Sequence, residues 1–315
     1  MSAAIEVSGL KKTYGPVEAV RGIDLSVAEG EVFALLGPNG AGKTTTVEIL
    51  EGFRRRTSGE VQVLGFDPAR REPGFRSQIG IVLQSTGVDP YLTVAETIRL
   101  YSGYYPNPRP IDEVIQLVGL VEKRDTRVLK LSGGQQRRLD VAIALAGDPR
   151  LLFLDEPTTG FDPGARRNAW EVVKNLTAIG KTIFLTTHFM DEAQYLANRV
   201  AVISKGEIVA EGPPSTLAGR GTAVTTVRFR LPPAAVELPS WGQTIGPDGA
   251  FQVSTEDPTR LLHDMTGWAL ERGLRFDSLE AHRPSLEDVY LELTRGEDQP
   301  DGAQAQAQAE EEAHR

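Results

Sequence analysis

The sequence predicts an α/β fold built on a parallel β-sheet, followed by a smaller domain that combines strands and helices. Three observations lead to this prediction. Short apolar runs typical of strands alternate with helical patterns up to residue 210, an order that favours a parallel sheet. One of these runs, residues 31–36, is followed by a glycine-rich turn and then a helical pattern. Glycine and proline cluster at residues 212–221, and a second set of strand and helix patterns begins beyond them.

The first part of the chain supplies the strands of the expected sheet. Residues 4–7 and 23–27 alternate branched apolar residues with polar ones, which indicates strands. Residues 31–36 are apolar almost throughout, as expected of a strand buried on both faces. A helix is predicted at residues 43–52. Four more runs predict strands of the same domain, at residues 61–64, 79–83, 151–154 and 182–186.

Two further segments complete this domain. The residues between 83 and 151 are mainly helical, so we expect a helical subdomain at about 86–150 inserted between two strands of the sheet. Residues 200–210 predict a hairpin whose turn is Lys205-Gly206.

The second domain is expected to be small and of mixed composition. Its predicted elements are strands at 225–231 and 251–254, a helix at 258–272, and a further strand and helix. Ser285 can cap the last helix, and one face of that helix carries Leu286, Val289, Tyr290 and Leu293. We therefore place one domain at 1–220 and another at 221–296, with a disordered acidic tail at 297–315 that has too little apolar content for a core.

Composition excludes several classes of protein. The 315 residues contain no cysteine, which excludes disulfides, thiol catalysis and thiolate metal sites. The four histidines have no ligand spacing, and no apolar run approaches the roughly 20 residues that cross a bilayer. With no secretory signal expected, we predict a cytoplasmic protein. The formal charge of −9 argues against nucleic acid as a partner.

A phosphate-binding loop is the strongest motif in the chain. The segment Gly37-Pro-Asn-Gly-Ala-Gly-Lys-Thr44 follows an apolar strand and opens a helix. Glycines let backbone N–H groups turn toward phosphate oxygens, while a lysine reaches the β- and γ-phosphates and a hydroxyl reaches Mg²⁺. Lys43 and Thr44 supply those two side chains.

Two other motifs complete a nucleotide site. Asp155 and Glu156 end an apolar strand, where one carboxylate can orient Mg²⁺ and the other can act as general base. The segment Leu131-Ser-Gly-Gly-Gln135 precedes a helical stretch, and its serine and glycines predict a second anion site at a helix start. Two phosphate sites in one chain make sense if the loop of one protomer faces the second site of another.

With these motifs in this order, residues 3–220 resemble the ATP-binding subunit of an ABC transporter, which has a P-loop NTPase fold. The resemblance implies that Tyr14 stacks on adenine. It implies that the phosphates are bound by the loop and the start of its helix: Gly37, Pro38, Asn39, Gly40, Ala41, Gly42, Lys43, Thr44 and Thr45. Mg²⁺ would be held by Thr44, Gln84 and Asp155.

The resemblance also assigns the residues of catalysis and of the dimer. Glu156 would be the general base, His188 would hold the γ-phosphate, and Gln84 would contact the metal and the attacking water. The partner's nucleotide would be capped by Ser132, Gly133, Gly134 and Gln135. Asp162 would lie in the loop that joins the two sites. The family more often has leucine where this chain has Phe161, which puts the packing of that interface in question.

The residues 284–294 resemble the tail domain of ATPases from the type 2 ABC exporter family, which includes daunorubicin-resistance-type drug pumps. That resemblance implies a second ATPase subunit, expected to be an identical copy, and a separate membrane permease that exports a drug, antibiotic or lipid-like compound. The ATPase would then be peripheral on the inner face of the membrane. The tail domain would serve assembly onto the permease or regulation, and a simple dimerisation domain is the alternative.

Two other functions stay open at this point. A non-transport ABC ATPase acting on ribosomes, DNA or cluster assembly is disfavoured because the chain has a single cassette and no long coiled coil. An importer ATPase with a regulatory tail is disfavoured by residues 285–294. The cargo is not written in this chain, since the ATPase need not touch it.

Overall fold

The protein is divided into two compact units. The computed structural model describes residues 2–70, 72–82, 87–217, 225–231, 239–241, 244–245 and 250–282. The first unit ends at Pro214, and the described residues beyond it belong to the second. Among the helices in these ranges, none is long and apolar enough to cross a membrane.

A six-stranded sheet forms the centre of the first unit, with strand order β5-β6-β7-β3-β8-β9. The first five strands in this order are parallel and β9 is antiparallel to β8. The strands are β3 (Val32–Leu36), β5 (Ile79–Val82), β6 (Leu151–Asp155), β7 (Thr182–Thr187), β8 (Arg199–Ser204) and β9 (Glu207–Gly212). Every residue of β3 and β7 is buried, so the continuous apolar runs correctly predicted strands covered on both faces.

A second sheet of three antiparallel strands, in the order β2-β1-β4, corrects part of the prediction. The expected strands 4–7, 23–27 and 61–64 lie here and not in the parallel sheet. Its strands are β1 (Ala3–Tyr14), β2 (Val17–Ala28) and β4 (Ser58–Val63). The first two follow one another with only two residues between them, and such a short connection permits only an antiparallel pair. The buried positions of β2 alternate with exposed ones over much of its length, as in a sheet with one wet face.

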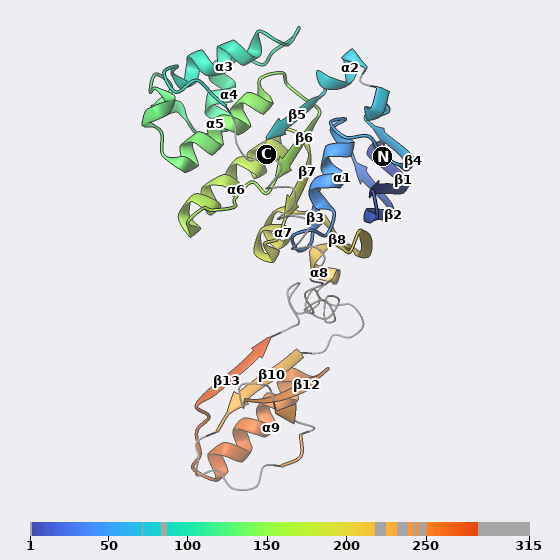
Figure 1. Cartoon of the computed structure of the whole chain (residues 1–315). Helices are drawn as coiled ribbons and strands as arrows, with labels where there is room; N and C mark the ends of the chain where they lie inside the picture. The colour runs from blue at the N-terminus through green and yellow to red at the C-terminus, as the bar shows by residue number, and fades with distance from the viewer. Residues whose placement is uncertain are drawn as a thin grey trace, which may run out of the picture. The chain divides into compact units, whose positions relative to one another are not determined.

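The helix α1 (Lys43–Leu50) packs between the two sheets (Figure 1). Apolar side chains from both sheets and from α1 form one core, which includes Val27, Phe33, Val47, Leu50 and Phe153. The start of α1 is thereby fixed at the carboxyl end of β3, where ligands bind in α/β sheets.

The residues between β5 and β6 form the predicted helical subdomain. They contain α3 (Val94–Ser102), α4 (Ile111–Leu117) and α5 (Gly133–Leu145), with short 3₁₀ turns at Val121–Lys123 and Val128–Lys130. In Figure 1 these helices lie together beside the β5 edge of the sheet, and α5 packs on β5. The remaining helices of the unit are α2 (Pro73–Arg76), α6 (Pro163–Ala178), α7 (Met190–Leu196) and the 3₁₀ turn Pro68–Arg70, and α8 (Pro214–Leu217) lies at the boundary between the units.

The hairpin of β8 and β9 has the predicted turn. Lys205 and Gly206 have φ angles of 48° and 81°, which is the left-handed pair that a two-residue hairpin turn requires.

The second unit is a four-stranded antiparallel sheet with one helix. The strand order is β11-β12-β10-β13. Its elements are β10 (Thr225–Arg230), β11 (Thr244–Ile245), β12 (Phe251–Thr255), α9 (Pro258–Glu271) and β13 (Ser278–His282). Val227, Phe229, Val253 and Met265 form its core. The predicted strands and the helix at 258–272 are confirmed, whereas the helix expected from Ser285 and the tail 297–315 lie outside the described residues.

Candidate active site

The phosphate loop connects β3 to α1 and leaves the start of the helix open. Gly42 precedes the helix with a φ of 105°, and no side chain caps the helix at this position. A Cβ at Gly42 would lie 2.5 Å from the carbonyl oxygen of Ala19, so only glycine fits. The uncapped N–H groups of the first turn are therefore a suitable site for a phosphate.

Lys43 lies at the centre of this loop and is only 5% exposed. Its Nζ donates hydrogen bonds to the carbonyl oxygens of Gly37 (2.7 Å) and Pro38 (3.1 Å), and it lies 3.5 Å from Oε1 of Glu156. Burial lowers the pKa of Lys43, and the nearby Glu156 carboxylate opposes this effect. The loop carbonyls thus fix the ammonium group against the residue that follows β6.

Glu156 contacts three other residues of the site. Its Oε1 lies 3.3 Å from Nδ1 of His188, in addition to the contact with Lys43, and its Oε2 accepts a hydrogen bond of 3.1 Å from the hydroxyl of Thr159. Burial acts to raise the pKa of Glu156, but the charges of Lys43 and His188 hold it below its ordinary value. The carboxylate is therefore ionised at neutral pH and can accept a proton.

Asp155 and Thr44 place two further oxygen groups beside the loop. Asp155 ends β6, and its carboxylate accepts a hydrogen bond from the hydroxyl of Thr186. Thr44 is exposed in the first turn of α1. Thr45, which follows, is half-buried. Gln84, the third expected metal-binding residue, lies outside the described residues.

Ser132 and Asp162 both begin helices. Ser132 caps α5: its N–H donates to Oε1 of Gln135 (3.0 Å), and the N–H of Gln135 donates back to the serine hydroxyl (3.4 Å). Asp162 caps α6 by accepting hydrogen bonds from the N–H groups of Gly164 and Ala165. Both side chains are thus oriented by their own chain before any partner is present.

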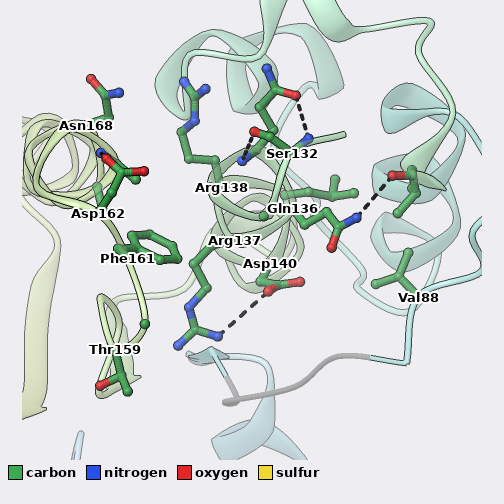
Figure 2. Close-up of a pocket in the computed structure, with 18 of the residues that line it drawn as sticks. Val88, Ser132, Gln136, Arg137, Arg138, Asp140, Thr159, Phe161, Asp162 and Asn168 are labelled. Carbon is green, nitrogen blue, oxygen red and sulfur yellow. Dashed lines mark hydrogen bonds and ion pairs between the residues drawn. The ribbon is translucent and has the colours of Figure 1, made fainter. Parts of the chain in front are cut away.

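The two caps line one hollow of about 1270 Å³, together with Gly133, Gly134, Glu156 and Phe161 (Figure 2). Ser132 and Gly133 are exposed at the entrance to α5. The structure therefore brings the predicted second anion site, the interface loop and the expected general base to one hollow.

Tyr14 lies apart from this hollow, at the end of β1. Tyr14 is 37% exposed, and two cations lie over its ring: Lys12 Nζ at 4.8 Å and Arg54 Cζ at 5.2 Å from the ring centre. The exposed aromatic ring is compatible with stacking on a base.

Two buried charged residues around the loop that carries Glu156 belong to none of the sequence motifs. Arg137 belongs to α5 and contacts this loop, and its position four residues before Val141, on the buried side of the helix, could have indicated it. Glu192 of α7 is fully buried and accepts hydrogen bonds from the hydroxyl of Thr158 (2.9 Å) and Nε1 of Trp170 (3.1 Å). Nothing in the sequence distinguishes Glu192 from an exposed acid of a first helical turn.

Comparison with known proteins identifies the family of this chain. Residues 20–159 match the family described as "ABC transporter", and residues 225–285 match "ABC transporter domain-containing protein-like, C-terminal domain". Nod factor export ATP-binding protein I of Cupriavidus metallidurans is 38% identical over 310 residues, which cover 93% of this chain and 98% of that protein. Daunorubicin resistance ATP-binding protein DrrA3 of Streptomyces coeruleorubidus is 35% identical over 302 residues, covering 92% and 96%.

Solved structures show the same fold. The ADP conformation of MJ1267, an ATP-binding cassette of an ABC transporter, gives a TM-score of 0.61 at 25% identity and covers 68% of this chain and 92% of that one. The dimeric post-hydrolysis state of the cassette MJ0796, bound to ADP and Pi, gives 0.59 at 27% identity, covering 66% and 98%. The chain therefore belongs to the family of ABC transporter ATP-binding proteins, in the group that holds these export proteins, and it is an ATPase.

Proposed function

We propose that this protein is the ATP-hydrolysing subunit of an exporter, in which two copies enclose two MgATP and drive a separate membrane permease. The observation that carries the proposal is the convergence of Lys43 and His188 on one carboxylate oxygen, Oε1 of Glu156, at 3.5 and 3.3 Å. A phosphate-binding lysine and a residue that can activate water are the groups that γ-phosphate hydrolysis uses, and here the lysine and an imidazole both contact that residue.

Each functional group of the site has a separate role in ATP hydrolysis. Glu156 takes a proton from the attacking water, because its pKa is held below its ordinary value and the carboxylate is ionised. Lys43 and the N–H groups at the start of α1 hold the phosphates. His188 lies next to the base and orients the γ-phosphate.

The oxygen groups near the loop fit Mg²⁺. The exposed hydroxyl of Thr44 and the carboxylate of Asp155 are hard ligands, and Gln84 is assigned as the third by the family resemblance. When bound, Mg²⁺ neutralises charge on the β- and γ-phosphates. In the described part of the chain, no group of three or more His, Cys, Asp or Glu could hold a metal.

The hollow beside α5 supports the head-to-tail dimer. Ser132 and Gly133 present an exposed helix start, and Asp162 lines the same hollow. We assign these groups, with Gly134 and Gln135, to the γ-phosphate bound by the partner subunit. MJ0796, a similar cassette, is dimeric in its post-hydrolysis state.

The relatives favour export. Two of them are named for Nod factor export and for daunorubicin resistance, and the similarity extends over 92% or more of this chain, through the second unit. We propose that the cargo is a drug, antibiotic or lipid-like compound, that residues 1–220 form the nucleotide-binding domain, and that residues 221–296 serve assembly onto the permease or regulation. The ATPase would then lie on the inner face of the membrane.

The test uses the full chain with Glu156→Gln, tagged and incubated with MgATP and detergent-solubilised native membranes. The amide keeps the size of the side chain but cannot act as base, so the closed, permease-bound dimer should accumulate. Glu18→Gln is the matched control, because Glu18 is exposed and pairs only loosely with Arg21 at 3.9 Å. Capture of a multi-spanning protein at equal stoichiometry is expected, and capture of ribosomes, DNA or soluble partners alone would contradict the transport role.

A further inference from the structure

Arg137 joins α5 to the backbone on both sides of Glu156. Its Nε donates a hydrogen bond to the carbonyl oxygen of Pro157 (3.3 Å), and its Nη2 donates to the carbonyl oxygen of Asp155 (3.2 Å). One guanidinium group therefore contacts the backbone carbonyls of the two residues that flank the residue assigned as general base.

The surroundings of Arg137 make these contacts specific. Arg137 is only 9% exposed, and its Nη1 lies 3.7 Å from the carboxylate of Asp140, one turn along the same helix. In Figure 2 the side chain extends from α5 away from Ser132, and its ion pair with Asp140 is drawn. Burying a cation costs free energy unless its N–H groups are hydrogen-bonded. Here the planar guanidinium of Arg137 donates to two backbone carbonyls, which a shorter side chain at this position could not reach together.

Glu156 needs such support because its backbone is strained. Its φ is 43°, in the left-handed region that residues with a Cβ rarely occupy, and such a conformation persists only where the surroundings fix it. The N–H of Glu156 donates to the carbonyl oxygen (3.2 Å) and hydroxyl (3.1 Å) of Thr186. Thr186 thus fixes the residue from β7, and Arg137 fixes the adjoining carbonyls from α5.

We propose that Arg137 is a positioning residue for ATP hydrolysis: it holds the backbone around Glu156 so that the carboxylate stays against Lys43 and His188. The proposal rests on the proposed role of Glu156 as general base. Arg137 itself does not contact the phosphates in this account. Its loss should therefore change the rate of the chemical step and leave nucleotide binding intact.

The experiment compares the full-length wild-type protein with Arg137→Gln and Arg137→Lys in steady-state ATP hydrolysis and in equilibrium binding of ATP. A misplacement of about 1 Å can cost about 100-fold in rate, so we expect Arg137→Gln to lower kcat by about 10- to 100-fold. The KM and the affinity for ATP should stay within about twofold, because the contacts of Lys43 are untouched. Arg137→Lys keeps the positive charge but has one ammonium group in place of the planar guanidinium. Its kcat should lie between those of the wild type and Arg137→Gln.

Lys181→Gln is the matched control. Lys181 is a cation that is only 8% exposed and bonded to Asp148 at 2.7 Å, and it precedes β7 at the end opposite His188. Its loss should lower the unfolding midpoint and leave kcat unchanged. If Arg137→Gln does not fold, Arg137→Lys decides the matter. A kcat of the folded Arg137 variants equal to that of Lys181→Gln, or a rise in KM at unchanged kcat, would overturn the proposal.

The double variant Arg137→Gln with Glu156→Gln separates the two proposals. If Arg137 acts through Glu156, the double variant should have the same residual kcat as Glu156→Gln alone, within about twofold, because residues that act as a unit are not additive. Losses that multiply would overturn the role of Arg137 and leave Glu156 as base. Near-normal kcat in Glu156→Gln alone would instead remove the base from both proposals.

Discussion

Glu51 makes stability of the first unit depend on pH. It follows α1, is only 7% exposed, and its pKa is raised from 4.5 to about 8, first by burial and then by the charges of Asp155 and Glu48. The folded protein therefore keeps the proton up to about pH 8, whereas the unfolded chain releases it near 4.5. Stability must fall as pH rises between these values. A pKa difference of about 3.5 corresponds to about 5 kcal/mol in the free energy of unfolding, as an upper limit.

The test is Glu51→Gln, which keeps the size of the side chain and cannot ionise. Urea unfolding is followed from pH 5 to 9 in a background where Trp241 and Trp268 are replaced by phenylalanine, so that Trp170 of α6 reports on the first unit alone. The gap between variant and wild type should widen in favour of the variant as pH rises from 5 to 9, by between about 2 and 4 kcal/mol. Glu192, whose pKa burial also raises, contributes equally to both proteins. Parallel stability curves would refute the reasoning.

Three further substitutions test separate contacts. Lys43→Ala should lower ATP turnover by at least about 100-fold, since it removes the cation that faces the phosphates; turnover near the wild-type rate would show that Lys43 is misassigned. Gly42→Ala should destabilise the protein by about 2 kcal/mol or more in urea unfolding, because its Cβ would lie 2.5 Å from the Ala19 carbonyl oxygen. Gly40→Ala is the control for backbone strain alone, since a Cβ at Gly40 would have no atom within 4 Å. Equal losses of stability in the two variants would contradict the clash. Asp67→Asn should cost about 1–2 kcal/mol, because it removes the charge and one of the two acceptors of the paired hydrogen bonds of 2.7 and 3.0 Å from Arg56; an unchanged thermal midpoint would contradict it.

The parallel sheet was predictable because its strands are buried on both faces. Residues 31–36 are apolar after Glu31, and residues 182–186 have an apolar centre between two threonines. A glycine-rich turn and a helix follow the first of these runs. The hairpin turn at Lys205 and Gly206 was equally clear. The separate antiparallel sheet was not, because alternation over 4–7 and 23–27 indicates a strand but not its partner.

Within the site, the sequence indicated residues in motifs but not residues that support them. Lys43 and His188 were expected to hold the phosphates and Glu156 to activate water, and in the structure Lys43 Nζ and His188 Nδ1 lie 3.5 and 3.3 Å from Oε1 of Glu156. Arg137 and Glu192 belong to no motif. Their roles depend on groups that are distant in the sequence: backbone carbonyls for Arg137, and the side chains of Thr158 and Trp170 for Glu192. The assignment of Gln84 stays a prediction.

The central claim is that Glu156 is the base in an otherwise complete nucleotide site, and steady-state hydrolysis by Glu156→Gln tests it most directly. A positioned general base contributes about 100- to 10,000-fold, so kcat should fall by that factor while equilibrium binding of ATP is retained. A kcat within threefold of wild type, with ATP still bound, would contradict the account.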